Sequence, residues 1–419
     1  MRANILVVTV FLASLWAPVA LAGGYDTPIL YSARHMGMGG TAVSYVSDPS
    51  ALFHNPAGLG KIKGISVLGD FSLLVGGIQG SPSALASANS IDSNTTVAPF
   101  FLVGGGIRIT DWLAAGLAVY PVASAGATYE YPGAGGTTVE DHTQLVFLEI
   151  SPGVAFVLPY NLRLGVGYRI TYTSLTRTVA PAGTTPIIDF TLTGTNFASF
   201  RAGLQWDALS EGTSDIDRRD LSFGLNYRHK TVVDVGADEG IALAQTGTDL
   251  KSDFTLPARL VFGVRGDYDR IGGAVDLEYG FNSQNERTTV SGDTAGGTRI
   301  SVNNVFAWSD AITLRGGLEY RWLDAGEFAT RLGYVFDGTT ANPQYPTAFG
   351  TPPTPTHSLT AGIGYDGGPW ETNLAYAYRF GSTTVTEGGT GAEVCQLCSA
   401  NGDYAIGLHG LYVDVSYDF

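Results

Sequence analysis

The sequence predicts an all-β protein, a transmembrane antiparallel β-barrel of about 14 strands with an N-terminal hatch plugging the lumen. Three observations support this fold class: long segments that alternate between apolar and polar residues, an N-terminal stretch typical of export, and a shortage of charge. The 419 residues include 56 Gly and 21 Tyr, and only 15% are charged, which is little for a soluble surface. A barrel in a bilayer needs fewer charges because its outer face is apolar.

Residues 1–22 are typical of a signal peptide. Arg2 gives a positive start, residues 5–19 are almost wholly apolar, and Ala20-Leu21-Ala22 offers a cleavage site. The apolar run is about 15 residues, short of the ~20 that a helix needs to cross a bilayer, so a retained anchor is the weaker alternative. We expect the mature chain to begin near Gly23.

Residues 23–63 show no sustained alternation, and we expect them to form a hatch. The segment is turn-rich and moderately apolar, and Asp48-Pro49 and Asn55-Pro56 are typical turn starters. A barrel of this size has a lumen that must be filled or left as a channel. The sequence therefore predicts that this segment fills the lumen and that residues 64–419 form the barrel wall.

Alternation with a period of two recurs from about residue 64 to the C-terminus. In residues 405–419 the odd positions are apolar except for His409, whereas the even positions include Asp414. A soluble sandwich also alternates, so strand length decides between the two architectures. Segments such as 143–159 and 302–322 exceed the ~5 to 6 residues usual in soluble sheets and reach the ~9 to 11 of membrane strands.

Counting these segments gives about 14 strands, and an even number suits a single-chain bacterial barrel. Their centres are expected near residues 71, 102, 118, 150, 168, 201, 226, 261, 276, 313, 332, 361, 376 and 412. Short turns should alternate with long external loops, which are rich in Gly, Thr and Pro here. The expected long loops are residues 180–186, 237–251, 282–297, 339–356 and 382–402.

Export and long alternating strands together predict the outer membrane of a Gram-negative-type bacterium. The surroundings are then outer-membrane lipid and lipopolysaccharide, and we expect a monomer. The net charge of −15 argues against nucleic acid as a partner, because its phosphates would be repelled.

Cys395 and Cys398 lie in a Gly/Thr-rich segment of an exported chain, where a disulfide is the expected state. A zinc site would need two further ligands, and none is obvious nearby, so the sequence predicts no metal and no cofactor. No G-x-S-x-G, H-E-x-x-H or phosphate-binding loop is present, so we do not expect an enzyme. A hydrolase site assembled from distant strands stays an open alternative.

The triplet Asn55-Pro56-Ala57 is followed, in order, by fragments at residues 116–121, 256–260, 314–321, 331–334 and 357–365. This series resembles the outer-membrane transporters of long-chain fatty acids and aromatic hydrocarbons, the FadL/TodX type, whose hatch carries a similar Asn-Pro-Ala landmark. The resemblance covers nearly the whole mature chain, and the shared order is more specific than any single fragment.

The resemblance implies a 14-stranded barrel, plugged by its N-terminal segment, that moves hydrophobic molecules across the outer membrane without an energy source. It also implies release sideways into the bilayer at an inward-kinked strand. The third strand, with Pro121 and Gly126, is the candidate for this lateral opening, because Pro lacks a ladder donor and Gly permits distortion. Alternatively, Pro121 ends that strand and begins an external loop.

Charges of both signs should face the lumen, either as a gate whose ion pairs rearrange or as a wet, fully paired lining. They are Arg163, Arg169, Arg265, Asp276, Glu278, Arg315, Glu319, Arg321, Arg331, Glu371, Arg379 and Asp414. Ile406, Leu408 and Tyr412 also face inward, where they suit a hydrophobic ligand but could equally pack against the hatch. We expect Asn55, with Pro56 and Ala57, to pin and gate the hatch, a plain turn being the alternative.

The leading hypothesis is therefore passive outer-membrane uptake of a hydrophobic small molecule, such as a long-chain fatty acid or a hydrocarbon. The alternatives are a general diffusion porin, in which residues 23–63 would lie outside the lumen, and a structural or adhesive surface barrel. Nothing in the sequence ranks the possible ligands.

Overall fold

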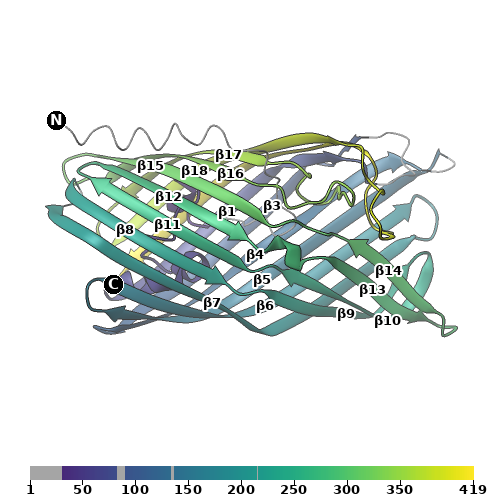
Figure 1. Cartoon of the computed structure of the whole chain (residues 1–419), viewed down its shortest axis with the longest axis horizontal. Coiled ribbons are helices and arrows are strands. Elements are labelled where there is room, and N and C mark those ends of the chain that lie inside the picture. The colour runs from purple at the N-terminus through teal and green to yellow at the C-terminus, as the bar shows by residue number, and fades with distance from the viewer. Residues whose placement is uncertain (1–30, 83–89, 134–135, 215) are drawn as a thin grey trace.

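The computed structural model describes residues 31–82, 90–133, 136–214 and 216–419, so the expected signal peptide lies outside the described residues. Its wall is one antiparallel sheet that closes on itself, because β1 pairs with β19 over fourteen residue pairs from Ser66–Asp418 to Gln79–Ala405 (Figure 1). The segments are β1 (Ile65–Gly80), β2 (Ile91–Asp92), β3 (Thr96–Thr110), β4 (Leu113–Pro132), β5 (Thr138–Leu158), β6 (Leu162–Pro181), β7 (Ile188–Ser214), β8 (Asp217–Arg228), β9 (Thr231–Ala242), β10 (Gln245–Leu256), β11 (Arg259–Tyr268), β12 (Ile271–Gly280), β13 (Arg287–Thr294), β14 (Arg299–Val305), β15 (Ala311–Trp322), β16 (Phe328–Asp337), β17 (Thr356–Asp366), β18 (Trp370–Val385) and β19 (Gly402–Asp418).

These 19 segments make 14 wall strands, which confirms the predicted fold class. The two-residue β2 is an addition to β1, and four wall strands are each divided in two, as β8/β9, β10/β11, β12/β13 and β14/β15. The prediction of one strand over residues 302–322 is therefore wrong. Residues 306–310 leave the ladder there, because the backbone N–H groups of Phe306 and Ala307 donate to the carbonyl of Glu286.

The outer face of the wall is apolar. In β19, Leu411, Val413 and Val415 are exposed, whereas Tyr412 and Asp414 between them are buried in the barrel. This is the alternation predicted from the sequence, and it is what a strand needs when lipid covers one of its faces.

Several strands form long hairpins at the end of the barrel away from the C-terminus, among them β9–β10 and β13–β14 (Figure 1). The predicted loop over residues 237–251 is wrong, because β9 and β10 pair across it and turn at Leu243 and Ala244. Both turn residues have positive φ, 53° and 59°, a conformation in which Gly or Asn is expected. Half of the predicted loop over residues 282–297 is likewise strand, because β13 lies within it and pairs with β14.

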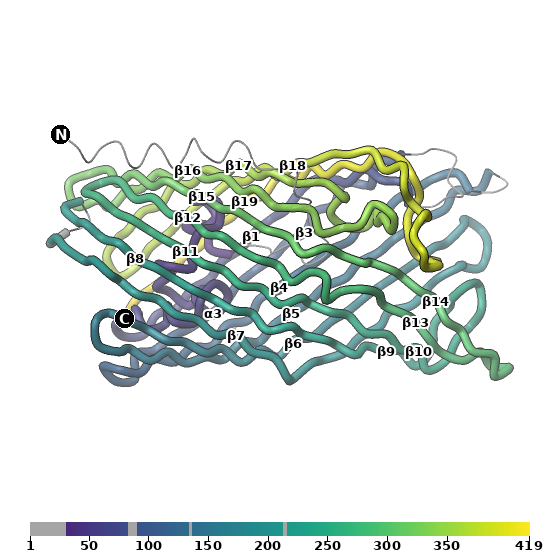
Figure 2. The backbone as a smooth tube through the Cα atoms, viewed as in Figure 1, coloured from purple at the N-terminus to yellow at the C-terminus, as the bar shows by residue number. Residues whose placement is uncertain are grey.

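Residues 31–63 lie inside the barrel, in the half where the C-terminus of the chain also lies (Figure 2). They contain three short helices, α2 (Ala33–Gly37), α3 (Ala51–His54) and the 3-10 helix η2 (Pro56–Lys61); a further 3-10 turn, η4 (Asn282–Gln284), lies in the wall. In the described part of the chain, no helix has the length and apolar content needed to cross a membrane.

Candidate transport site

The segment of residues 31–63, here called the lumen segment, spans the barrel interior from wall to wall. Helix α2 contacts β16 to β19, whereas η2 contacts β4 to β7 on another side and α3 contacts β4 and β5. Nearly all of its side chains are buried, including the apolar Leu52, Leu59 and Tyr31. The segment therefore contacts opposite sides of the wall at its own level.

Asn55 fixes the middle of the lumen segment. Its side-chain amide donates to the carbonyl oxygens of Val43 (2.7 Å) and of Leu204 in β7 (2.9 Å), and its Oδ1 accepts from the backbone N–H of Ala57 (3.2 Å). Pro56 starts η2 directly after this cap, at a position where its missing N–H costs no helical bond. The predicted triplet thus links the lumen segment to itself and to the wall.

Wall glycines make room for this contact. A Cβ on Gly203 would lie 1.8 Å from Oδ1 of Asn55, and a Cβ on Gly165 would lie 2.2 Å from the backbone of Pro56. On the opposite wall, a Cβ on Gly333 would lie 2.1 Å from the backbone N of Gly39. These distances are far below van der Waals contact, so the lumen segment lies in grooves that any larger residue would fill.

Part of the seam between β3 and β4 has no strand pairing. The two strands pair only from Val103–Val119 to Thr110–Leu113, whereas β3 stays paired with β1, and β4 with β5, well beyond Val103 and Val119. We call the unpaired stretch, residues 96–102 of β3 and 120–127 of β4, the seam window. Its far end is bounded by a bond from the N–H of Asn94 to the carbonyl of Thr128 (2.8 Å).

The window begins next to Pro121, where the sequence predicts a kink. The β4–β5 register slips between Pro121 and Ala123, so Val122 is an extra residue, a β-bulge. The carbonyl of Pro121 accepts a hydrogen bond from the hydroxyl of Tyr31 in the lumen segment. Strand β4 nevertheless continues to Pro132, so the alternative in which Pro121 ends the strand is wrong. A Cβ on Gly126 would lie 2.4 Å from the carbonyl oxygen of Thr143, which explains a glycine there.

An apolar cavity of about 200 Å³, here called the ligand cavity, lies beside the window. The window strands line it with Thr96, Ala98 and Phe100 of β3 and with Ser124, Ala125 and Gly126 of β4. The three predicted contact residues Ile406, Leu408 and Tyr412 line it too, next to Leu74 and Ile78 of β1. Arg315, Asp337 and Arg379 give it one polar end.

A smaller cavity of about 80 Å³, the mouth cavity, lies farther toward the end of the barrel where the long hairpins are. It shares Ala125 and Gly350 with the ligand cavity, so the two adjoin. Its lining is largely aromatic and aliphatic and includes Phe190, Phe254, Phe306, Trp308, Phe349 and Leu397.

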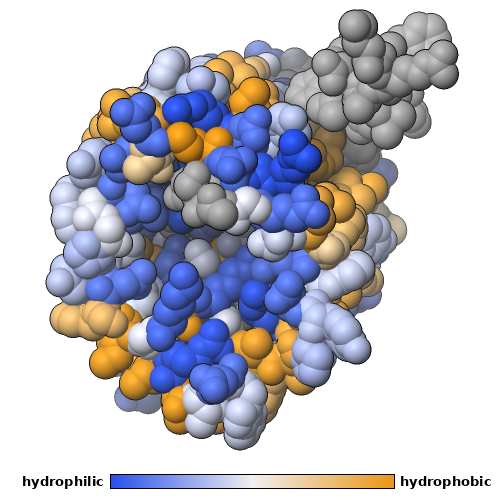
Figure 3. Space-filling model, turned by 90° about the vertical axis from the view of Figure 1, so that its left-hand side faces the viewer, coloured by the Kyte–Doolittle hydropathy of each residue, from blue (hydrophilic) through white to orange (hydrophobic). Residues whose placement is uncertain are grey.

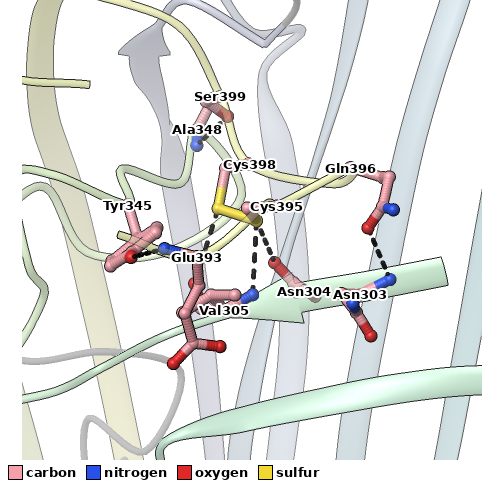
Figure 4. Close-up of a disulfide and its surroundings, with 10 residues drawn as sticks. All are labelled: Asn303, Asn304, Val305, Tyr345, Ala348, Glu393, Cys395, Gln396, Cys398 and Ser399. Carbon is pink, nitrogen blue, oxygen red and sulfur yellow. Dashed lines mark hydrogen bonds between the residues drawn. A yellow bond between two sulfur atoms is a disulfide. The ribbon is translucent and has the colours of Figure 1, made fainter. Parts of the chain in front are cut away.

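A disulfide joins Cys395 and Cys398 in the loop between β18 and β19 (Figure 4). The loop crosses to β14, where Sγ of Cys395 accepts from the N–H of Val305 (3.2 Å). Gln396 accepts from the N–H of Asn303 (2.9 Å) and donates its own N–H to the Asn303 carbonyl (3.0 Å). This disulfide loop therefore covers one side of the mouth cavity.

On the other side of the lumen segment the lumen is charged. Glu319 accepts from Arg265 (2.8 Å), Arg331 (2.7 Å) and Arg321 (3.3 Å), and all four side chains are nearly inaccessible to solvent. At this end of the molecule, hydrophilic residues surround the opening and apolar residues lie along the outer wall (Figure 3). Glu319 thus pairs with three of the predicted lumen arginines. Three others pair with carboxylates outside the predicted set: Arg163 with Asp207, Arg169 with Glu149, and Arg379 with Asp337.

The sequence interpretation missed several lumen charges. Arg201, Glu149 and Arg259 are all buried inside the barrel. The alternation carried the signal, because Phe200 and Leu204 mark the outward face of β7 and so place Arg201 inward.

Two histidines lie in the lumen segment, and their rings are 5.0 Å apart. Burial lowers the pKa of His54 to about 3, and burial together with the neighbouring His54 holds the pKa of His35 well below its ordinary value. Nε2 of His54 lies 2.8 Å from the carbonyl oxygen of Tyr31, so the neutral ring carries its hydrogen on Nε2. Among the described residues, no group of three or more His, Cys, Asp or Glu side chains could hold a metal ion.

These features define a class of protein: a closed 14-stranded barrel that holds residues 31–63 in its lumen and lacks pairing along part of the seam between β3 and β4. No family model and no curated protein sequence matches the chain. Solved structures do match. A FadL homologue from Pseudomonas aeruginosa gives a TM-score of 0.71 at 15% identity and covers 95% of this chain and 100% of that one.

Two toluene transporters are similar as well. TodX of P. putida has a TM-score of 0.67 and TbuX of Ralstonia pickettii one of 0.65, each at 17% identity; they cover 93% and 94% of this chain and 99% of their own. The chain therefore has the fold of FadL/TodX-type barrels, which confirms the resemblance predicted from the sequence.

Proposed function

We propose that this protein takes up hydrophobic small molecules passively across the bacterial outer membrane and releases them through the seam window into the bilayer. The observation that carries the proposal is that an apolar cavity of about 200 Å³ opens against the one stretch where β3 and β4 do not pair. A molecule in this cavity has lipid-facing wall beside it, since Val97 and Phe101 on the outer face of β3 are exposed and apolar.

The charged end of the lumen favours release through the window over release along the axis. A hydrocarbon moving along the axis would have to displace the lumen segment and then cross the ion pairs around Glu319. Breaking buried ion pairs costs several kcal/mol, and the molecule would end in water, where apolar surface is unfavourable. The window avoids both costs.

The segment inside the lumen counts against a general diffusion porin. A porin needs a continuous aqueous path, whereas residues 31–63 are packed into wall grooves at Gly165, Gly203 and Gly333. A purely structural or adhesive barrel would need neither an apolar cavity nor an unpaired seam. The similar structures with known roles are described as transporters of toluene, a neutral hydrophobic compound, and not as enzymes.

In this proposal the lumen segment is part of the hatch, residues 23–63, and is pinned by Asn55, Pro56 and Ala57. Residues 1–22 are removed on export. The mouth cavity receives the ligand first, and Ile406, Leu408 and Tyr412 contact it in the ligand cavity. The barrel acts as a monomer surrounded by lipid and lipopolysaccharide.

Two neighbouring residues of β3 offer a matched test. Ala98 faces the ligand cavity at the window, whereas Val97 faces outward and is 61% exposed. We expect Ala98→Trp to reduce uptake of radiolabelled toluene and oleate at least about tenfold in cells without another route, because the indole fills the cavity. Val97→Trp should leave uptake unchanged. Equal uptake by both variants, at equal amounts of folded barrel, would contradict the proposal.

A further inference from the structure

A continuous row of aromatic side chains crosses the outer face of the wall from β16 to β19. We call it the Tyr–His belt, and its members in order of contact are Tyr334, His357, Phe380, Tyr378, His409 and Tyr376. Each ring contacts the next, with centroid distances from 4.7 Å between Tyr378 and His409 to 6.1 Å between Tyr334 and His357. The alternation along each strand places all of them on the outer face.

The belt lies at one edge of the apolar band. On β18 the outward-facing residues run from Trp370 at one end to Phe380, and beyond it Ser382 and Thr384 are exposed and polar. The ten steps from Trp370 to Phe380 rise about 23 Å at ~3.3 Å per residue and a tilt of ~45°, close to the ~25 Å height of an apolar band. The belt is therefore at the level of the lipid head groups.

This edge belongs to the end of the barrel that carries the long hairpins. Trp370 of β18 lies opposite Tyr417, near the C-terminus, whereas Val385 lies opposite Gly402 at the far end of the same strand pair. Long loops of such barrels are external, so the lipids at the belt are those of the outer leaflet. In an outer membrane that leaflet contains lipopolysaccharide, whose lipid A carries a phosphate on each of its two sugars.

A tyrosine hydroxyl holds each histidine of the belt. Nδ1 of His357 lies 2.7 Å from the hydroxyl oxygen of Tyr334, and Nδ1 of His409 lies 2.7 Å from that of Tyr376. With the hydroxyl as donor, Nδ1 accepts and the ring carries its hydrogen on Nε2. Within the described residues neither Nε2 has a hydrogen-bond partner, and an N–H group beside lipid costs free energy unless a head group accepts from it.

The surroundings of the two N–H groups favour an anionic acceptor. Every outward-facing residue of β16, β17 and β18 is uncharged, so no carboxylate on these strands repels a phosphate. A charged acceptor also makes the stronger hydrogen bond.

The spacing of the two histidines favours two acceptors. His357 lies opposite Phe380, which lies opposite Gly407, so His357 and His409 are two strands and two residues apart. At ~4.8 Å between strands and ~3.4 Å per residue, their Cα atoms are about 12 Å apart. One phosphate cannot accept from both rings at that distance, whereas a head of two sugars with a phosphate at each end can.

We infer that the Tyr–His belt binds the lipid A of lipopolysaccharide, with His357 donating to one phosphate and His409 to the other. The inference goes beyond the proposed uptake, because it assigns a lipid site to the outside of the wall. Tyr334 and Tyr376 orient the two imidazoles.

The test titrates the full mature barrel in detergent with three lipids and counts bound lipid by native mass spectrometry. The lipids are lipid A with both phosphates, the same lipid A with both phosphates removed, and phosphatidylglycerol, which has a single phosphate. The variant is His357→Phe with His409→Phe, which keeps both rings and removes both N–H donors. His142→Phe is the matched control, because His142 lies on β5, outside the belt, and bonds to Thr128 (2.8 Å).

We expect the wild-type barrel to bind the phosphorylated lipid A at least about tenfold more tightly than the other two lipids. The double variant should weaken this binding about 10- to 100-fold, as for loss of hydrogen bonds to a charged group, and change the phosphate-free form less than about twofold. Each single variant should lose part of the affinity, and His142→Phe should lose none. The folded band on unheated gels shows that each variant is folded.

Three results would overturn the inference. Equal binding of phosphorylated and phosphate-free lipid A by the wild type would mean that the belt recognises no phosphate. An equal loss of both forms in the double variant would mean that the rings act only as an apolar surface. Phosphatidylglycerol bound as tightly as lipid A would mean that the site takes a single phosphate.

Discussion

The contact between Gly203 and Asn55 allows a single methyl group to test how the lumen segment is held. In Gly203→Ala the new Cβ would lie 1.8 Å from Oδ1 and 2.8 Å from Cγ of Asn55, so the amide must move. Its two short bonds, to the carbonyls of Val43 and Leu204, are then lost. At about 1 kcal/mol for each hydrogen bond, the lumen segment is destabilised by about 2 kcal/mol, a factor of about 30.

Hydrogen exchange measures this factor directly. The N–H of Gly58 donates to the carbonyl of Asn55 (2.9 Å), so its protection reports on the turn that Asn55 holds. We expect protection at Gly58 to fall about 30-fold in Gly203→Ala. Gly316→Ala is the matched control, because a Cβ on Gly316 meets nothing within 4 Å and should leave protection unchanged. Wild-type protection at Gly58 in Gly203→Ala would refute the reasoning.

Three further predictions concern charge, protonation and the disulfide loop. Glu319→Gln should destabilise the barrel by about 3 to 5 kcal/mol, because it removes the buried carboxylate that Arg265, Arg321 and Arg331 share. Glu393→Gln, in an exposed pair, should cost less than about 1 kcal/mol, and the urea midpoints of the two variants, followed by the folded band on unheated gels, compare them. Burial lowers the pKa of His54 to about 3, below the ordinary value of 6.5, so the contribution of His54 to stability is complete above pH 6.5 and is lost as the pH falls toward 3. The ring ¹⁵N signal of His54, assigned by its absence from His54→Gln, should be that of a neutral imidazole at pH 5. An imidazolium signal at that pH would contradict the prediction. Replacing both Cys395 and Cys398 by Ser should leave the wall folded but speed protease cleavage of the loop between β18 and β19, and reductant should have the same effect on the wild type.

Alternation was sufficient to predict most of the wall. Each expected strand centre lies within a wall strand, because the pleat sets the period of two and lipid makes one face apolar over the whole length. The turn at Leu243 and Ala244 could not be predicted, since neither residue favours positive φ and the paired strands on both sides impose it. The division at residues 306–310 was also hidden, because Phe306 and Trp308 fit an alternating pattern while leaving the ladder.

For the candidate site, the sequence could predict which face of its strand a residue occupies, but not which residues of other strands lie next to it. The inward face of β19 follows from its alternation, so Ile406, Leu408 and Tyr412 were found, and all three line the ligand cavity. Pro121 and the family resemblance indicated the position of the seam window. Its extent depends on how far β3 stays paired with β1, and β4 with β5, beyond the point where β3 and β4 separate. The set of side chains around Arg201 comes from β7, β8, β12 and the lumen segment, which no local pattern brings together.

The wall grooves also bear on how the barrel is assembled. The lumen segment is synthesised before every wall strand, whereas β1 can pair with β19 only when the last strand exists. A sheet still open at that edge already offers the grooves at Gly165 and Gly203, onto which Asn55 and Pro56 can dock. When the lumen segment docks into these grooves before β1 pairs with β19, the chain does not have to thread its own start into a closed barrel.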